Sequence, residues 1–270
     1  METPDILNAV LSKLPRGNLS EAVVRAISEK GSERIDATGR WDDIDLDVTD
    51  CTVTWRDRWA LDPLLPSIGG LTLGRHSKDM MRWPLPNLEH LDIVGVHLGE
   101  IITYPPWNLQ TLRLVRVRTS GTDPEALRRW VRGLRVCTLE LSDTQLGDAL
   151  VAVIASELGP DVHQLEISHA RFRRAGALAI AQAISRLDTL VDVSVRGNFI
   201  ADVGFLAIAS SACHRVAHLD VSDCGISCNG ADAGIAKLSP SRSLLTLWAG
   251  GNHGEDSFKK AEMDKCSVYV

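Results

Sequence analysis

Two histidines and two cysteines near residue 220 have the residue types of a metal site. Cysteine thiolate and histidine imidazole are ligands that zinc prefers in proteins, and His214, His218, Cys224 and Cys228 fall within one short stretch. The surrounding hydrophobic pattern argues against a shared site, because it directs Cys224 into the core and His218 to the opposite face of a strand. We therefore expect no metal ion at these residues.

Motifs for catalysis are absent from the sequence. It contains no GxSxG nucleophile elbow, no phosphate-binding P-loop and no HExxH metalloprotease helix. A cysteine nucleophile with a histidine base would also need a pocket, which a regular repeat fold does not supply. The sequence therefore predicts a protein that is not an enzyme and holds no cofactor.

The composition is that of a folded chain, with 44% hydrophobic and 24% charged residues among 270. A formal net charge of −6 argues against a general nucleic-acid binder. No apolar run approaches the roughly 18 residues that a membrane helix needs, and the N-terminal residues lack a secretory pattern. The six cysteines are too sparse for a disulfide scaffold. These features favour a cytoplasmic or nuclear protein without nucleic-acid or membrane partners.

A short hydrophobic frame recurs along most of the chain. Written L-x-x-L-x-L-x-x-N-x-L, it is clearest in the segments that begin at Leu190, Val216 and Leu244. The fourth frame position recurs about every 20 to 28 residues, at Ile44, Leu71, Leu91, Leu112, Leu139, Leu165, Val193, Leu219 and Leu247. A frame that returns in this way indicates a repeat protein, in which each unit buries its apolar face against its neighbours.

The frame resembles that of the leucine-rich repeat family over roughly residues 41–255, and its last five units have the spacing of the ribonuclease-inhibitor-like class. The resemblance implies an α/β leucine-rich repeat solenoid with a curved parallel sheet and helices on the convex side of its C-terminal half. We expect an N-terminal helical segment over 1–35, a solenoid of about nine units over 36–255, and a C-terminal cap or tail over 256–270.

The segments that return from one strand to the next differ between the two halves of the solenoid. Apolar residues at helical spacing predict helices over 148–158, 176–184 and 203–209. Prolines in 83–86 and 104–107 predict extended segments instead, because proline cannot continue a helix.

Residues 5–30 predict two short helices separated by a break at Pro15. This segment resembles an F-box on Asp5, Ile6, Leu7, Val10, Leu11, Ser12, Leu14, Pro15, Asn18 and Leu19. The resemblance implies a ubiquitin ligase substrate receptor, in which Leu7, Leu11, Leu14, Pro15 and Leu19 bind a Skp-type adaptor of a cullin-RING ligase. The alternative is an amphipathic cap that shields the first repeat.

The third and fifth frame positions leave the core and are expected on the concave sheet face, the usual binding surface in the resembled family. The partner-binding residues predicted on this face are Asp45, Asp92, Arg113, Glu140, Glu166, Asp220, His218 and Trp248. The excess of acids predicts an electronegative groove for a protein partner with a basic surface. Trp248 is the best anchor, since interface hot spots favour tryptophan, unless it packs under the tail around Phe258 and Tyr269.

Arginines are dense between residues 113 and 135. They are Arg113, Arg116, Arg118, Arg128, Arg129, Arg132 and Arg135, and the last four lie on or beside a helix that begins at Pro124. They form either a solvated helix face or a surface for an acidic partner. Taken together, the sequence predicts a non-catalytic protein-interaction module, with an F-box-like receptor as its sharper form and a scaffold, assembly subunit or inhibitor as the alternative.

Overall fold

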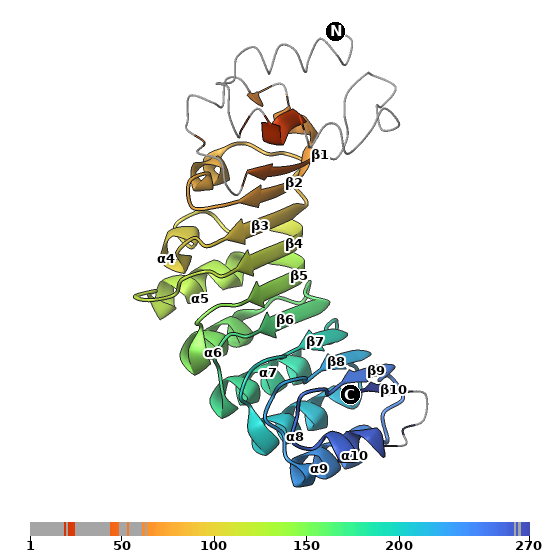
Figure 1. The fold of residues 1–270 in the computed structure, drawn as a ribbon. Coiled ribbons are helices and arrows are strands. Elements are labelled where there is room, and N and C mark those ends of the chain that lie inside the picture. The colour runs from red at the N-terminus through yellow and green to blue at the C-terminus, as the bar shows by residue number, and fades with distance from the viewer. Residues whose placement is uncertain are drawn as a thin grey trace. The chain divides into compact units, whose positions relative to one another are not determined.

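The computed structural model describes residues 19, 21–24, 44–48, 53, 61, 62, 64–261, 263 and 266–270. The chain divides into two compact units: unit 1 comprises 1–96 with 109–113, and unit 2 comprises 97–108 with 114–270. Within each unit the strands are parallel and follow one another in chain order (Figure 1). The predicted boundary at residue 35 lies outside the described residues.

Unit 1 contains three described strands that pair in parallel, β1 (Ile44–Val48), β2 (Ile68–Leu73) and β3 (His90–Val94), and the short 3₁₀ helices η2 (Leu65–Ser67) and η3 (Lys78–Arg82). Leu46, Leu71 and Leu91 align across the three strands and are all buried. Apolar residues at a strand period of two thus build the core of this unit. The strand β4 (Asn108–Val115) is divided, because residues 109–113 belong to unit 1 and the rest of the strand to unit 2.

Unit 2 carries the more regular repeats. Its strands are β5 (Arg135–Ser142), β6 (Gln164–Ser168), β7 (Asp192–Ser194), β8 (His218–Asp220), β9 (Thr246–Trp248) and β10 (Ser267–Tyr269). Its helices are α4 (Leu98–Ile101), α5 (Pro124–Gly133), α6 (Gly147–Glu157), α7 (Arg174–Arg186), α8 (Ala201–Ala212), α9 (Cys228–Leu238) and α10 (Glu255–Lys259). From α5 to α10, each helix packs against the next (Figure 1).

The return segments agree with the sequence in the second half and differ in part before it. Helices α6, α7 and α8 confirm the predictions over 148–158, 176–184 and 203–209. The proline segments 83–86 and 104–107 are not helical, but a short helix, η3 or α4, precedes each of them. Both helices are over before the proline segments begin, η3 at Arg82 and α4 at Ile101, so no helix continues into either segment, as predicted.

A buried hydrogen-bond ladder connects the last units. The side-chain amide of Asn198 donates to the carbonyls of Ile167 and Val195, at 2.7 and 2.9 Å, and its Oδ1 accepts from Ala170 N–H. Asn252 repeats the arrangement two units later: its amide donates to two carbonyls, and its Oδ1 accepts from two backbone N–H groups. This ladder satisfies backbone groups that would otherwise be buried without a partner.

Cys224 occupies the ladder position between these two asparagines. Its side chain is fully buried, as the frame predicts, and its Sγ donates to Val195 O at 3.3 Å. Burial raises the pKa of the Cys224 thiol to about 12. The ladder therefore contains a neutral thiol between two amides.

The strand register and the repeated turns define an α/β leucine-rich repeat solenoid. The fourth frame position gives the residues Leu139, Leu165, Val193, Leu219 and Leu247, which pair in register from β5 to β9 and are all buried. In the predicted cap or tail over 256–270, α10 ends and β10 adds a parallel strand beside β9. None of the helices in the described ranges is long and apolar enough to cross a membrane.

Candidate protein-binding face

The predicted concave face of unit 2 is continuous from β5 to β10, because the residues at equivalent frame positions pair in register. The fifth-position residues are Glu140, Glu166, Ser194, Asp220 and Trp248, and Tyr269 of β10 extends the row. The third-position row runs alongside it as Thr138, Gln164, Asp192, His218 and Thr246. The sequence frame thus placed Glu140, Glu166, His218, Asp220 and Trp248 on one strand face.

In the first repeat Asp45 lies on the predicted strand face, but one row away from its predicted position. The frame aligned Ile44 with Leu71, whereas the structure pairs Leu46 with Leu71, so Asp45 falls opposite Gly70 in the third row. The fifth position of β1 is Asp47, which pairs with Thr72. Because strand side chains alternate with a period of two, Ile44 and Leu46 fit the apolar frame equally well in the sequence, and only the pairing with Leu71 shows that Leu46 takes the fourth position.

Asp92 and Arg113 both belong to unit 1 and interact directly. Arg113 Nη1 lies 3.2 Å from Asp92 Oδ2 on the exposed strand face. The single predicted arginine of the fifth-position row therefore neutralises its acidic neighbour. The acidic character of the predicted face is best developed in unit 2.

An open groove of about 540 Å³ lies on this face of unit 2. Its lining includes the acidic residues Glu166, Asp192 and Asp220, together with Gln164, Ser194, Arg196, His218 and Trp248. The lining arginine, Arg196, is paired with Asp223 at 3.5 Å. We call this surface, with its lining residues, the acidic groove.

The carboxylates of the face are held by residues two positions further along the chain. Ser142 Oγ donates to Glu140 at 2.8 Å, and Ser168 Oγ donates to Glu166 at 2.7 Å. Asp220 Oδ1 accepts from Ser222 N–H at 2.9 Å. Serine two residues after each glutamate therefore fixes the glutamate without cancelling its charge.

Asp192 differs from the other acids of the groove. Its Oδ1 is buried but accepts no hydrogen bond, and the nearest cationic candidate, His218 Nε2, lies 3.9 Å away. A carboxylate oxygen without a donor is costly to bury. Asp192 was not among the predicted partner-binding residues, although its frame position had placed it on this face.

Aromatic side chains line the groove at its C-terminal end. Trp248 stacks on Tyr269 with ring centroids 5.9 Å apart and an interplanar angle of 20°, and the His218 ring lies 6.2 Å from Trp248. Trp248 remains 38% exposed, so packing beside the tail does not remove it from the surface. Phe258 is instead fully buried against Phe205. Packing of Trp248 beside Tyr269 was one of the two alternatives left open by the sequence, although Tyr269 itself was not among the predicted partner-binding residues.

The predicted adaptor-binding residues are mostly beyond the part of the chain that the structure describes. Leu7, Leu11, Leu14 and Pro15 lie outside the described residues. Leu19 is described and is buried, as is the neighbouring Val23. Leu19 therefore has little surface to offer a partner.

The arginines on and beside α5 are largely paired with acids. Arg128 and Arg132 both contact Glu157, at 2.7 and 3.0 Å, and Arg135 contacts Asp161 at 3.0 Å. Hydrogen bonding from Arg132 and Arg128 lowers the pKa of the Glu157 carboxyl. This part of the arginine-rich stretch is a network of ion pairs between α5, α6 and their flanking segments.

The histidines and cysteines near residue 220 do not converge. Cys224 points into the core, while His218 lies on the acidic groove. Within the described ranges, no group of three or more histidine, cysteine or acidic side chains is placed to hold a metal ion. The described cysteines are all free thiols.

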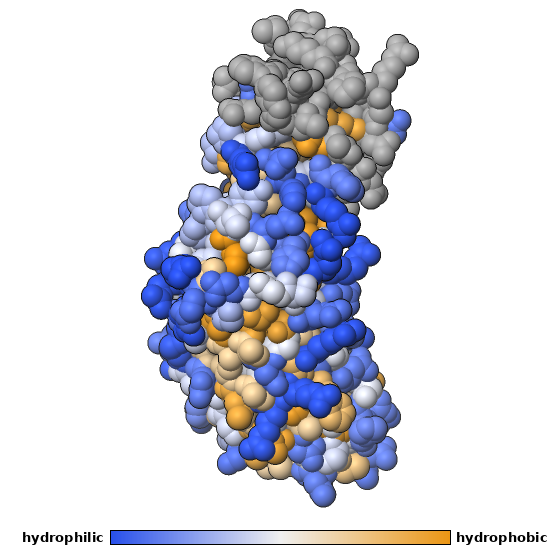
Figure 2. All heavy atoms as spheres, turned by 90° about the vertical axis from the view of Figure 1, so that its left-hand side faces the viewer, coloured by the Kyte–Doolittle hydropathy of each residue, from blue (hydrophilic) through white to orange (hydrophobic). Residues whose placement is uncertain are grey.

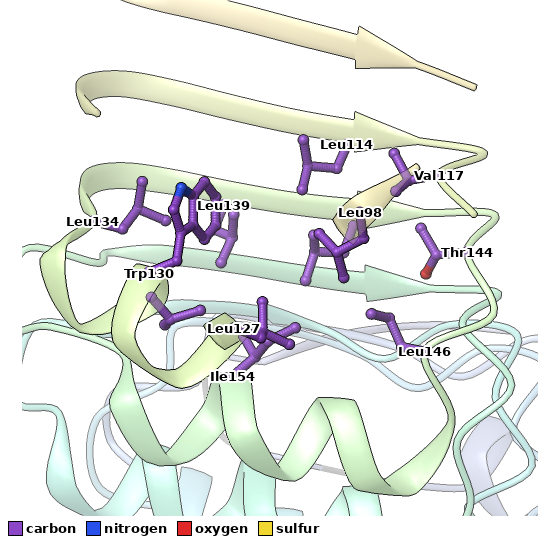
Figure 3. Close-up of a pocket in the computed structure, with 12 residues that line it drawn as sticks. Leu98, Leu114, Val117, Leu127, Trp130, Leu134, Leu139, Thr144, Leu146 and Ile154 are labelled. Carbon is purple, nitrogen blue, oxygen red and sulfur yellow. The ribbon is translucent and has the colours of Figure 1, made fainter. Parts of the chain in front are cut away.

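A second hollow lies inside unit 2, between the strands and helices α5 and α6 (Figure 3). Leucine, isoleucine and valine side chains line most of it, and Trp130 and Thr144 lie at its two ends. Its volume is about 10 Å³, which is at most enough for one water molecule. It is a small packing defect in an apolar core and has no room for a substrate.

No family model matches the sequence, and no curated protein matches it. Among solved structures, one similar chain comes from the crystal structure of the Rad7 and Elc1 complex in yeast. It is 12% identical, the alignment covers 98% of this chain and 91% of that chain, and the TM-score is 0.41.

Proposed function

We propose that this protein is a non-catalytic protein-binding module of the leucine-rich repeat type, and that its acidic groove binds a partner with a basic surface. The observation that carries the proposal is the groove itself, where Glu166, Asp192 and Asp220 stand beside the exposed ring of Trp248. The proposal includes the absence of catalysis, the absence of a cofactor, and a cytoplasmic or nuclear location.

The electrostatics of the groove favour a cationic partner. The carboxylates are partly exposed, and the lining arginine is already paired with Asp223. Clustered charge of one sign steers an opposite charge toward the surface and raises the association rate.

The aromatic end of the groove supplies an anchor. Trp248 is held in place by its stacking on Tyr269, yet more than a third of its surface is open. An arginine or lysine over a tryptophan face gains cation–π attraction. Because Asp220 pairs with Trp248 across the two strands, one cationic side chain can contact the ring and the carboxylate together.

A labelled arginine-rich peptide tests the proposal directly. We expect binding that weakens with salt, and an Asp220→Asn, Trp248→Ala variant with at least roughly tenfold weaker affinity. The matched control is Asp188→Asn, Leu245→Ala, which removes one exposed acid and one exposed apolar side chain elsewhere. Equal loss in both variants, or no loss in either, would contradict the proposal.

An F-box-like substrate receptor is the second candidate, favoured by the apolar pattern of residues 5–19. In this form the acidic groove holds the target, and Leu7, Leu11, Leu14 and Pro15 bind a Skp-type adaptor. The buried state of Leu19 and Val23 supports the alternative cap at the C-terminal end of the segment.

Co-purification of the full chain with a Skp-type adaptor separates these alternatives. Under the receptor hypothesis, Leu14→Asp abolishes adaptor binding while circular dichroism shows an unchanged melting temperature. Under the cap hypothesis, the wild-type chain binds no adaptor, and the same substitution lowers the melting temperature. The second result leaves a scaffold, an assembly subunit or an inhibitor as the form of the binding module.

A further inference from the structure

A second charged surface lies where the strands of unit 2 end and the return segments begin. The C-terminal ends of the strands lie on the left in Figure 1, and Figure 2 shows this side of the molecule, where strongly hydrophilic residues border apolar ones. In unit 2 this edge is formed by segments 116–120, 143–147, 169–174 and 196–200. We call it the arginine edge.

Five exposed arginines of this edge have unengaged side chains. They are Arg116, Arg118, Arg171, Arg173 and Arg174, and no guanidinium among them forms an ion pair or hydrogen bond with any described residue. The remaining arginines of unit 2 mostly behave differently, since Arg128, Arg132, Arg135, Arg186, Arg196 and Arg215 contact acids or carbonyl oxygens. Unpaired cationic groups gathered on one edge are available to a ligand.

The acids near this edge do not neutralise it. Asp148 Oδ1 accepts hydrogen bonds from the backbone N–H groups of Arg173 and Gly176, at 2.8 and 2.7 Å, and so caps α7. Asp223 is paired with Arg196. Asp143 is exposed between the Arg116 and His169 positions but forms no ion pair with the arginines. The edge therefore carries a positive excess although the whole chain is acidic.

The backbone of the edge makes the same left-handed turn in successive units. Arg116, His169 and Arg171 have φ of 51°, 50° and 59°, a region where bulky residues are uncommon. The eighth frame position holds Arg116 and His169, and the same position holds glycine at Gly197 and Gly251. Glycine would adopt this conformation at less cost than arginine or histidine. Asp143 and Asp223 hold the same position with φ of 53° and 57°, so the left-handed turn recurs from unit to unit and sets the spacing of the side chains along the edge.

An exposed aromatic residue stands in the same edge. Phe199 is 62% exposed and lies against Gly225, where a side chain would clash with its ring. Arg171 and Phe199 occupy the tenth frame position of neighbouring units. A cationic row beside an apolar ring fits a segment that carries both acidic and apolar residues.

We propose that the arginine edge binds an acidic protein segment, with Arg116, Arg118, Arg171, Arg173 and Arg174 contacting its carboxylates and Phe199 contacting an apolar side chain. A nucleic acid is the less favoured ligand, because the net charge of −6 opposes a long polyanion. The surface is separate from the acidic groove and does not depend on its function.

Fluorescence anisotropy with defined probes tests this inference. The probe is a fluorescein-labelled peptide in which glutamate alternates with phenylalanine, compared with a glutamine version and with labelled oligothymidylate. Of the three probes, we expect only the glutamate peptide to bind. The double variant Arg171→Glu, Arg174→Glu should bind this peptide with roughly tenfold or more lower affinity. We also expect Phe199→Ser to weaken the complex.

Matched variants make the test specific. Arg129→Glu changes an exposed arginine of α5, and Leu245→Ser changes an exposed leucine outside the edge; each should alter affinity by less than about twofold. No binding of the glutamate peptide, equal binding by the Arg171→Glu, Arg174→Glu variant, or tighter binding of oligothymidylate would each overturn the proposal.

Discussion

His169 lies against Gly197 at the edge of unit 2, so closely that a Cβ on Gly197 would overlap the imidazole ring. Gly197 has φ of +71° and its N–H donates to Ser222 O at 2.9 Å. The N–H of His169 forms the equivalent bond to Arg196 O in the preceding turn. Two requirements, a left-handed backbone and an absent side chain, therefore meet at one residue.

Gly197→Ala should destabilise unit 2 by about 3 kcal/mol, because alanine meets both the left-handed backbone and the His169 ring. Gly121→Ala is the control: its φ is +72°, but no atom lies within 4 Å of the added Cβ, so a cost of about 1 kcal/mol is expected. Urea unfolding of both variants measures the difference.

The double variant His169→Ala, Gly197→Ala isolates the contact. Removing the ring should return the cost of Gly197→Ala to that of the control, since only the backbone strain remains. If His169→Ala restored no stability to the Gly197→Ala variant, backbone strain would account for the whole cost and the contact with the ring for none of it.

Asn198→Ala should destabilise the protein by about 3 kcal/mol, because it leaves the carbonyls of Ile167 and Val195 and the N–H of Ala170 buried without partners. Asn229→Ala changes an exposed asparagine and should cost less than about 0.5 kcal/mol. Thermal unfolding monitored by circular dichroism compares them. Similar melting temperatures for the two variants would show that the ladder contributes little.

The sequence predicted the repeated parts of the fold because their causes are local and recur. Strand alternation directs the fourth and the ninth position of each repeat frame into the core. Leu165 and Leu219 at the fourth position, and Cys224 and Asn252 at the ninth, are accordingly buried where the frame placed them. The same alternation placed Glu166, Asp220 and Trp248 on one face. To place these residues, only the register of each strand was needed, and the same register recurs in each neighbouring repeat.

Sequence reasoning fell short where the pairing between strands decides the placement. Asp45 was assigned to the wrong row of the correct face, because Ile44 and Leu46 fit the apolar frame equally well and only their pairing with β2 sets the phase. For Trp248 the sequence left two alternatives open, an exposed anchor or packing beside Tyr269, and only the pairing of β10 with β9 shows that both hold.

The arginines were grouped by closeness in sequence, yet the fold divides them. Arg128 and Arg132 bind Glu157, whereas Arg116 lies on the same edge as Arg171 from two repeats later. The spacing of arginines along the chain does not show which of them pair with acids of another repeat. The arginine edge, which is defined by unpaired arginines, could therefore not be predicted from the sequence.

Cys224 should resist alkylation in the folded protein. Its pKa of about 12 leaves almost no thiolate at pH 8, and its side chain is fully buried. Cys228 is exposed and serves as the internal control. Mass spectrometry after iodoacetamide treatment should find Cys228 modified and Cys224 unmodified until denaturant is added. Modification of Cys224 at the rate of Cys228 would contradict its buried position.

The same thiol should make stability depend on pH in the alkaline range. Its folded pKa is raised from the ordinary 9.0 to about 12, so its contribution is fully present below pH 9 and is lost as the pH rises through 12. Cys224→Ala removes this part of the dependence, so the stability difference between wild type and variant should shrink as the pH rises through this range. A constant difference across the range would contradict the assignment.

Glu157 should give a dependence of the opposite sign. Hydrogen bonds from Arg132 and Arg128 lower its folded pKa below the ordinary 4.5, so its stabilising effect is present above pH 4.5 and is lost as the pH falls through the folded pKa. Glu157→Gln should cost up to about 1 kcal/mol at neutral pH, and little once the carboxylate of the wild type is protonated. Asp188→Asn is the control, since Asp188 forms a single pair with Arg215 and its side chain is 80% exposed. Urea unfolding at neutral and acidic pH should show that the free-energy penalty of Glu157→Gln disappears in acid, whereas Asp188→Asn has no penalty at either pH. The reason for the difference is that a single exposed ion pair contributes almost nothing, while Glu157 is largely buried and pairs with two arginines.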